Sequence, residues 1–150
     1  MKLEDQVISL KLAKKLKKLG VRQESLFYWC IIDNGVDGEQ DIIPLTEKEM
    51  DYYDDVLGSV EYTEIASAFT VAELGEMLPE EIIVTNRFDD KNIYFLDFCK
   101  FEDRWDVSYK NDILKKVTQC YVNGRTEANA RAQMLVWLVE NGYLKLKEEK

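Results

Sequence analysis

The sequence has no histidine among its 150 residues. Without an imidazole, the chain can form neither a Ser-His-Asp or Cys-His catalytic arrangement nor a His-containing zinc site. General acid–base catalysis would have to rely on carboxylates, lysine, tyrosine or cysteine. The motifs of phosphate-binding loops, dinucleotide-binding turns and nucleophile elbows do not occur either. We therefore expect no catalytic residue, no metal site and no cofactor, and a non-enzymatic protein is favoured.

Cysteine is scarce as well. The three cysteines, Cys30, Cys99 and Cys120, lie far apart in apolar or aromatic surroundings, and no C-x-x-C spacing occurs. An odd number of widely spaced cysteines indicates reduced thiols rather than a disulfide framework. Because free cysteine behaves as a small apolar residue, we expect all three thiols to be largely buried.

Proline occurs only twice, and no Pro/Gly/Ser-rich stretch interrupts the chain. The length suits one domain with an ordinary core, so a single domain is predicted over residues 1–150. No apolar run approaches the roughly 20 residues that span a bilayer, and the first residues do not resemble a signal peptide. We expect an intracellular protein that does not enter membranes.

Charge is distributed unevenly along the chain, whose net value is −9. Residues 1–23 carry seven basic and two acidic side chains, whereas residues 24–64 carry one basic and twelve acidic. Nucleic-acid backbones require positive charge, so no nucleic-acid partner is expected for the chain as a whole. The acidic middle segment either keeps the protein soluble or faces a basic surface on another protein.

Helical patterns occur at residues 9–19, 70–78 and 126–141. The first has leucines on one face and lysines on the other. The second opens with the capping box Thr70 to Glu73, and the third runs from Thr126 as N-cap to Gly142. A second capping box, Thr46 to Glu49, predicts a short helix inside a mobile acidic connection at about residues 46–60.

Strands are predicted at residues 26–32, 41–45, 82–85, 93–101 and 105–109, with turn residues between them. Residues 113–117 suggest one helical turn, followed by a short strand at 120–122. Pro44 would place its strand at a sheet edge because proline cannot donate to the ladder. The fold class predicted is α+β, with one mostly antiparallel sheet of four to six strands packed against two or three helices.

Two groups of residues are candidates for binding a protein partner. Asp51, Asp54 and Asp55 form an acidic cluster beside two tyrosines. Their spacing does not match a calcium-binding loop, so an acidic contact surface or a solvated segment is favoured over a metal site. Met134 and Trp137 lie on a second apolar stripe of the last helix. That stripe is either buried inside the domain or contacts a partner, which includes a second copy of the chain.

Aromatic residues suggest an alternative function in binding a small ligand such as a nucleotide. Trp29, Tyr94 and Trp105 could stack on a base, although stacking platforms normally lie in a positively charged groove. Arg87, Arg104 and Lys110 are candidate basic groups for such a site because they lie near Tyr94 and Trp105 in the sequence. Ordinary core packing is the competing interpretation of all three aromatic residues, and a carboxylate-based or metal-dependent hydrolase is a third, less favoured class.

Three segments of the chain occur together in a characteristic order. They are SLKLAKKLKKLGVRQESLFYW, AFTVAELGEMLP and TEANARAQMLVWLVENGYL. In combination they resemble a widespread group of small bacteriophage and prophage proteins without an assigned activity. The resemblance covers about a third of the chain. It implies a phage or prophage origin, the cytoplasm of a bacterial host and an α+β fold, and it identifies no catalytic residue.

These observations together favour a phage accessory protein that acts by binding a host or phage protein. A specific version is inhibition of a host defence or nucleic-acid-handling protein through an acidic surface. The alternatives are a nucleotide-binding or nucleotide-sequestering protein and a homo-oligomeric structural protein joined through Met134 and Trp137.

Overall fold

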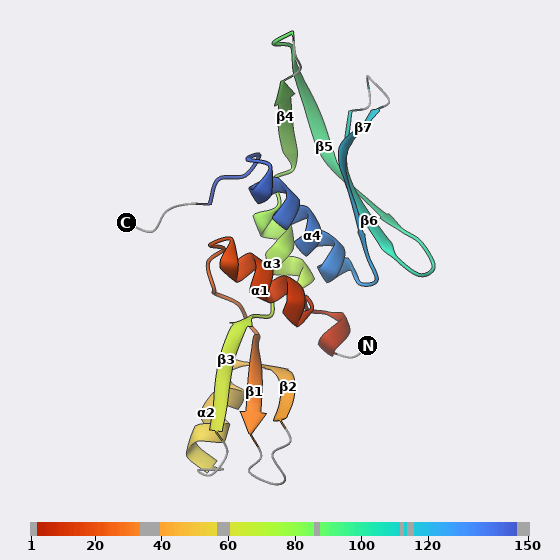
Figure 1. Cartoon of the computed structure of the whole chain (residues 1–150). Helices are drawn as coiled ribbons and strands as arrows, with labels where there is room; N and C mark the ends of the chain where they lie inside the picture. Colours follow the sequence, from red (N-terminus) through yellow and green to blue (C-terminus); the bar gives the residue numbers. More distant parts are fainter. Residues whose placement is uncertain are drawn as a thin grey trace. The chain divides into compact units, whose positions relative to one another are not determined.

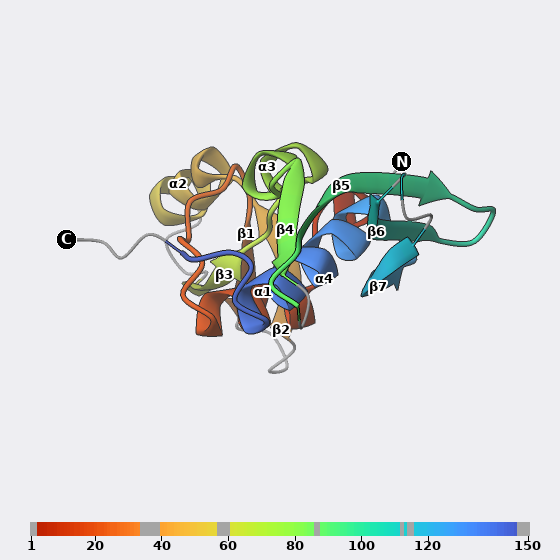
Figure 2. The same cartoon turned by 90° about the horizontal axis from the view of Figure 1, so that it is seen from above.

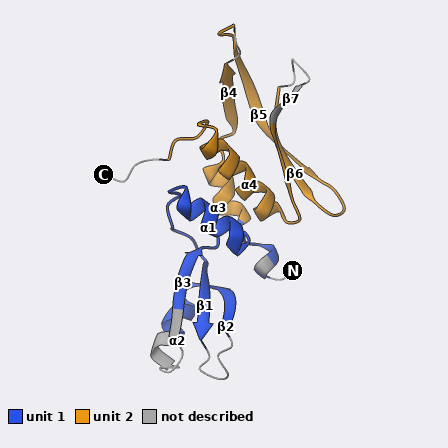
Figure 3. Cartoon of the chain, viewed as in Figure 1, with its two compact units in different colours: residues 1–70 blue, residues 71–150 orange. Residues whose placement is uncertain are grey.

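The computed structural model describes residues 3–33, 40–56, 61–85, 88–111, 113 and 116–146, without the side chains of residues 4, 54–56, 61, 62 and 116–119. The chain separates into two compact units, Met1–Thr70 and Val71–Lys150 (Figure 3). We call them unit 1 and unit 2 and describe each by itself. That residues 1–150 make up one domain stays a prediction.

Unit 1 is a three-stranded antiparallel sheet with two α-helices. Its elements are the 3-10 helix Leu3–Asp5, α1 (Leu10–Lys18), β1 (Tyr28–Asp33), β2 (Gln40–Leu45), α2 (Glu47–Val56) and β3 (Glu61–Ser67). The strand order is β2-β1-β3, so Pro44 does lie on an edge strand (Figure 1). Strand β3 was not predicted from the sequence.

The helices of unit 1 form where the sequence predicts them. Helix α1 buries Ala13 and Leu16 and exposes its lysines. Gly20 follows the C-cap residue Leu19, and its φ of 85° is costly for any residue with a Cβ. In the capping box of α2, the Thr46 N–H donates to the Glu49 carboxylate at 2.8 Å. The Glu49 N–H in turn donates to the Thr46 hydroxyl at 3.3 Å.

One hydrophobic cluster of unit 1 lies between the sheet and α2. Its buried members come from both elements and are Tyr28, Cys30, Ile32, Leu45 and Met50, with Ile43 and Tyr53 packed against them. The predicted helix within the acidic connection is therefore confirmed, and it packs on the sheet through Met50. Residues 57–60 of that connection lie outside the described residues.

Unit 2 is a four-stranded antiparallel meander with one helix before it and one after it. Its elements are α3 (Val71–Met77), β4 (Glu81–Thr85), β5 (Lys91–Lys100), β6 (Trp105–Asn111), β7 (Lys116–Gly124) and α4 (Glu127–Glu140). The strand order is β4-β5-β6-β7. Helix α4 packs against β6 and β7, and Figure 2 shows β5, β6 and β7 to one side of it.

The α+β class with antiparallel pairing is confirmed, but the strands form two sheets where one was predicted. The predicted helical turn at residues 113–117 is wrong for its last two residues. Lys116 and Val117 begin β7 and pair with Asn111 and Lys110 of β6. A neighbouring strand supplies the ladder of hydrogen bonds, and this outweighs the weak helical tendency of the short segment.

The connection from β7 to α4 is unusually tight. Thr126 caps the helix as predicted, accepting a hydrogen bond from the Asn129 N–H at 3.2 Å. The preceding Gly124 is buried against the first turn of α4. A Cβ at position 124 would lie 2.6 Å from the backbone nitrogen of Ala130. Only glycine therefore fits where the sheet passes into the helix.

Arg131 joins α4 to the rest of unit 2. Its guanidinium donates to the Glu127 carboxylate, with a 2.9 Å bond from Nε, and lies 4.1 Å from the ring centroid of Phe98 on β5. A Cβ at Gly75 of α3 would lie 3.1 Å from Arg131 Nη1. The glycine inside a short helix, which costs roughly 1 kcal/mol relative to alanine, thus makes room for this guanidinium.

Candidate partner-binding surfaces

Helix α2 is surrounded by exposed carboxylates. We define the acidic surface of unit 1 by the exposed residues Asp41, Glu47, Glu49, Asp51 and Glu64. Glu47 and Asp51 are one helical turn apart on α2. Asp41 of β2 pairs with Ile32 of β1, and Glu64 of β3 pairs with Cys30. Ile32 and Cys30 face α2 in the cluster with Met50, and directly paired residues share a sheet face, so both carboxylates lie on the face that α2 covers. Three elements thus contribute to one negatively charged surface.

The sequence places Asp51, Asp54 and Asp55 together, and all three belong to α2. Asp51 is exposed, while the side chains of Asp54 and Asp55 are not among those described. In the described part of the chain, no group of three or more Cys, Asp or Glu side chains is arranged to hold a metal ion.

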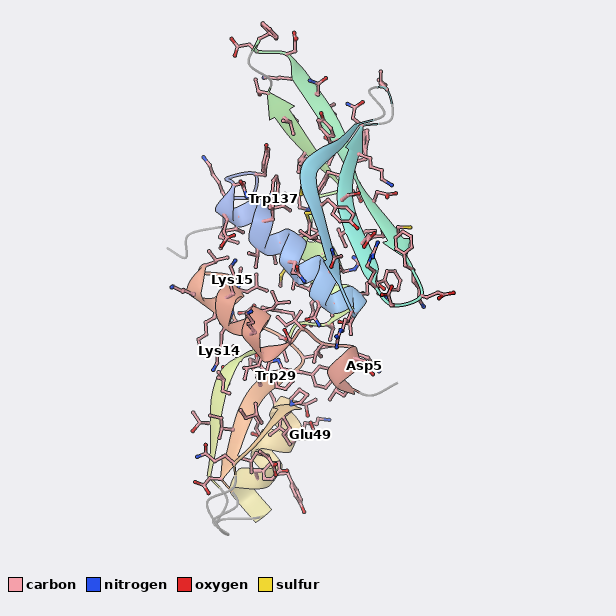
Figure 4. All side chains as sticks on the ribbon, turned by 45° about the vertical axis from the view of Figure 1, so that its right-hand side comes forward. Asp5, Lys14, Lys15, Trp29, Glu49 and Trp137 are labelled. Carbon is pink, nitrogen blue, oxygen red and sulfur yellow. The ribbon has the colours of Figure 1, made fainter. Side chains whose placement is uncertain are left out.

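A basic surface lies on α1 of the same unit. Its exposed residues are Lys11, Lys14, Lys15, Lys17 and Lys18. The Lys17 ammonium donates to the Ile65 carbonyl of β3 at 2.7 Å. Figure 4 labels Lys14 and Lys15 on α1 and Glu49 on α2. In unit 1, α1 therefore carries most of the basic residues, whereas α2 is mainly acidic and has Lys48 as its one basic residue.

Trp29 is a core residue of unit 1. The side chain is buried, and its indole Nε1–H donates to the Ile8 carbonyl at 2.9 Å. The Ile8 N–H donates to the Phe69 carbonyl at 3.0 Å, so the segment before α1 is held both by Trp29 of β1 and by the residues that follow β3. The polar group of the indole is thus already satisfied within the protein, and the other predicted ligand residues belong to unit 2.

The predicted ligand residues of unit 2 that the structure describes are buried or already contact other side chains. Tyr94 is buried, and Arg87 lies outside the described residues. The Lys100 ammonium lies 5.4 Å from the ring centroid of the half-buried Trp105. The Lys110 ammonium forms an ion pair with Asp97. Among the described candidates, Tyr94 thus belongs to the core, and Trp105 and Lys110 already contact Lys100 and Asp97.

Arg104 belongs to a polar network that the sequence did not reveal. Its Nε donates to Asp106 at 3.0 Å, and the Tyr121 hydroxyl donates to the other oxygen of Asp106 at 2.7 Å. The hydrogen bond that each side chain donates to the Asp106 carboxylate is the main cause that raises the pKa of Arg104 and of Tyr121. With its pKa raised, the Tyr121 hydroxyl keeps its proton at neutral pH and remains a hydrogen-bond donor, so Asp106 of β6 and Tyr121 of β7 stay joined.

Helix α4 does not present Met134 to a partner. Met134 is fully buried, and the Cys120 thiol of β7 lies 2.9 Å from its sulfur. Trp137 is half-buried and stacks on Tyr143, with ring centroids 5.1 Å apart. Of the two interpretations of the second apolar stripe, burial inside the protein therefore holds for Ala130 and Met134.

The three cysteines differ in exposure. Cys30 and Cys120 are buried, but Cys99 is exposed on β5, contrary to prediction. Its side chain points to the sheet face opposite α4, because it alternates with Phe98, which contacts Arg131. Burial, and secondarily Glu64, raises the pKa of the Cys30 thiol to about 11.

We predict that a thiol reagent at neutral pH modifies one cysteine per native chain and three per unfolded chain. Cys99 reacts because it is exposed. With a pKa of about 11, Cys30 has a thiolate fraction on the order of 10⁻⁴ at pH 7, and its site excludes reagent. Absorbance titration and peptide mass spectrometry measure this, with Cys99→Ser as the control that labels no native thiol. Rapid labelling of native Cys30 would contradict the structure.

No protein-family model, curated protein or solved structure matches this chain. Across the described residues, no helix is both long enough and apolar enough to span a bilayer.

Proposed function

We propose that this chain is a non-enzymatic accessory protein of a phage or prophage, active in the bacterial cytoplasm, that binds a basic surface of a host or phage protein. The acidic surface of unit 1 is the binding site in this proposal. In its specific form, the partner is a host defence or nucleic-acid-handling protein. Carboxylates would then occupy a surface that otherwise receives phosphates, which blocks nucleic-acid binding.

The observation that carries the proposal is the separation of charge within unit 1. Lys48 is the only basic residue between positions 24 and 64. The exposed carboxylates of that segment come from β2, α2 and β3 and surround one helix. Grouped charges of one sign produce a field that steers an oppositely charged protein and orients its approach.

The alternatives have less support. Ligand binding would require a tryptophan that is already hydrogen-bonded to Ile8 and an arginine that is already paired with Asp106. A homo-oligomer joined through α4 would require Met134 at the surface, and Met134 is buried. Neither alternative is favoured by a particular contact.

The proposal predicts a salt-sensitive partner in a pull-down of the tagged protein from bacterial lysate. We expect the double variant Glu47→Lys/Asp51→Lys to lose at least about tenfold of the captured partner, because two attractive contacts become repulsive. High salt should give a similar loss through screening. Glu49 is left unchanged because it caps α2. Quantitative mass spectrometry measures the captured protein.

The matched control reverses two exposed carboxylates of unit 2. Glu76→Lys/Glu102→Lys changes the net charge by the same amount without touching α2. This variant should retain the partner. If both double variants lost the captured partner equally, net charge alone would explain the effect. If the partner were still captured at high salt and by both variants, the acidic surface would not be the binding site.

A further inference from the structure

Strand β4 has a free edge. It lies at the end of the four-stranded sheet, and within the described residues β5 is its only partner strand (Figure 1). The residues Glu81–Thr85 read EIIVT, four of which are β-branched. Such a segment strongly favours the extended conformation and pairs readily with another strand.

The hydrogen bonds to β5 determine which groups of β4 point outward. The Leu96 N–H donates to the Glu80 carbonyl at 2.9 Å. In an antiparallel pair, hydrogen-bonded and non-hydrogen-bonded residues alternate, so Ile82 and Val84 direct their backbone groups toward β5. The N–H and C=O groups of Glu81, Ile83 and Thr85 therefore point away from the sheet.

The other sheet edges carry features that hinder pairing. Strand β2 contains Pro44. Helix α1 packs against β3, where Lys17 donates to the Ile65 carbonyl. A register shift interrupts the pairing of β6 with β7 between Ser108 and Lys110. Proline, coverage by a helix and bulges each protect an edge. Within the described residues, β4 contains no proline, its pairing with β5 shows no register shift, and no helix packs closely against it.

The side chains beside this edge are apolar and exposed. Ile83 is 54% exposed, and Ile93, directly opposite on β5, is 43% exposed. Phe95, two residues further along the same face of β5, is 51% exposed. These three residues form an apolar stripe on the sheet face opposite α4. Exposed apolar residues beside a free edge indicate that the edge is covered by another chain.

We infer that a second copy of this chain pairs with β4 across a two-fold axis at Ile83. In an antiparallel pairing of β4 with itself, this register places Ile83 opposite Ile83 and Glu81 opposite Thr85. In no other register does each of Glu81, Ile83 and Thr85, whose backbone groups point outward, lie opposite one of the same three residues in the second copy. The two four-stranded sheets then continue into each other, and the contact is isologous.

Charge supports this occupant over an unrelated basic protein. The register keeps the two Glu81 carboxylates apart and directs each toward the other copy's Lys91, which neighbours Thr85 on β5. Glu81 and Lys91 are both exposed. The apolar stripes of the two copies become continuous at Ile83. The edge is therefore complementary to itself in hydrogen bonding, charge and apolar character.

The test measures mass by analytical ultracentrifugation over a range of protein concentrations. We expect a reversible dimer with a dissociation constant on the order of 10 µM, because the paired strands are short. Ile83→Pro removes an outward N–H and keeps the bonds to β5, and Ile83→Lys adds charge at the axis. Both should weaken the dimer at least about tenfold. Ile42→Lys, which changes an exposed isoleucine on the edge strand β2, should leave it unchanged.

Amide hydrogen exchange tests the register independently of the variants. Exchange at Glu81, Ile83 and Thr85 should slow as protein concentration rises, whereas Ile82 and Val84 should be protected at every concentration. A chain that stays monomeric up to about 500 µM, far above the expected dissociation constant, would overturn the inference. So would a dimer that both Ile83 variants leave intact. Because the contact is largely apolar and backbone-mediated, the dimer should persist in salt that abolishes the proposed acidic interaction.

Discussion

Replacing Gly124 with alanine is expected to destabilise unit 2 by about 3 kcal/mol or more. The added methyl group would lie 2.6 Å from the Ala130 nitrogen and 3.0 Å from the Asn129 carbonyl carbon. Both contacts are with backbone atoms in the first turn of α4, so no side-chain rotation can relieve them. Either β7 must leave its register with β6 or α4 must move away from the sheet. Urea-induced unfolding followed by circular dichroism measures the loss.

The control for this prediction is Gly142→Ala. Gly142 has a φ of 75°, and a methyl group added there would meet no atom within 4 Å. Alanine at this position therefore destabilises the protein only because it must adopt a left-handed backbone conformation, which costs roughly 1–2 kcal/mol. Gly124 shows no positive φ, so its cost arises from the close approach alone. If the two variants were equally stable, the tight passage from β7 to α4 would not exist as described.

Replacing Trp29 with alanine is expected to destabilise unit 1 by about 3–5 kcal/mol. The substitution removes a buried aromatic ring and leaves the Ile8 carbonyl without its donor. Trp29→Phe keeps a buried six-membered ring but removes the N–H together with the rest of the indole, so a smaller loss of about 1–2 kcal/mol is expected. The difference between the two variants measures how much of the loss comes from the buried six-membered ring. Urea titrations of both variants give these differences.

Trp105→Phe is the matched comparison because Trp105 is only half-buried. We expect it to change the stability by less than Trp29→Phe does. A role of Trp29 in ligand binding would give the opposite pattern, in which Trp29→Phe keeps full stability and loses an activity. That result would support the alternative in which Trp29 binds a ligand.

The local sequence predicted most elements because their signals act over a few residues. Thr46 and Glu49 form the capping box that starts α2, and Thr126 caps α4, as the spacing indicated. The alternating and β-branched patterns of β1, β5 and β6 needed no distant partner to be recognised. In contrast, β3 is recognisable only through its pairing with β1, since its sequence EYTEIAS has no continuous apolar pattern.

The candidate surfaces were only partly predictable. Asp51 was identified because a dense run of carboxylates is visible in the sequence, and it is exposed. Met134 and Trp29 were ambiguous because an apolar residue on a helix or strand gives the same pattern in a core and in an interface. Their hydrogen bonds, to Cys120 and Ile8, place them in the core. The free edge of β4 was invisible because strand order is not a local property.

The sequence by itself determined the α+β class, the capped helices, the uneven charge and the exclusion of histidine chemistry within this chain. These follow from residue identity and from interactions within one or two turns. Only the tertiary structure decided that the strands form two sheets, that Cys99 is exposed and that Gly124 and Gly75 make room for Ala130 and Arg131. Such features depend on which segments meet after folding, and packing between residues far apart in the chain leaves no short-range pattern.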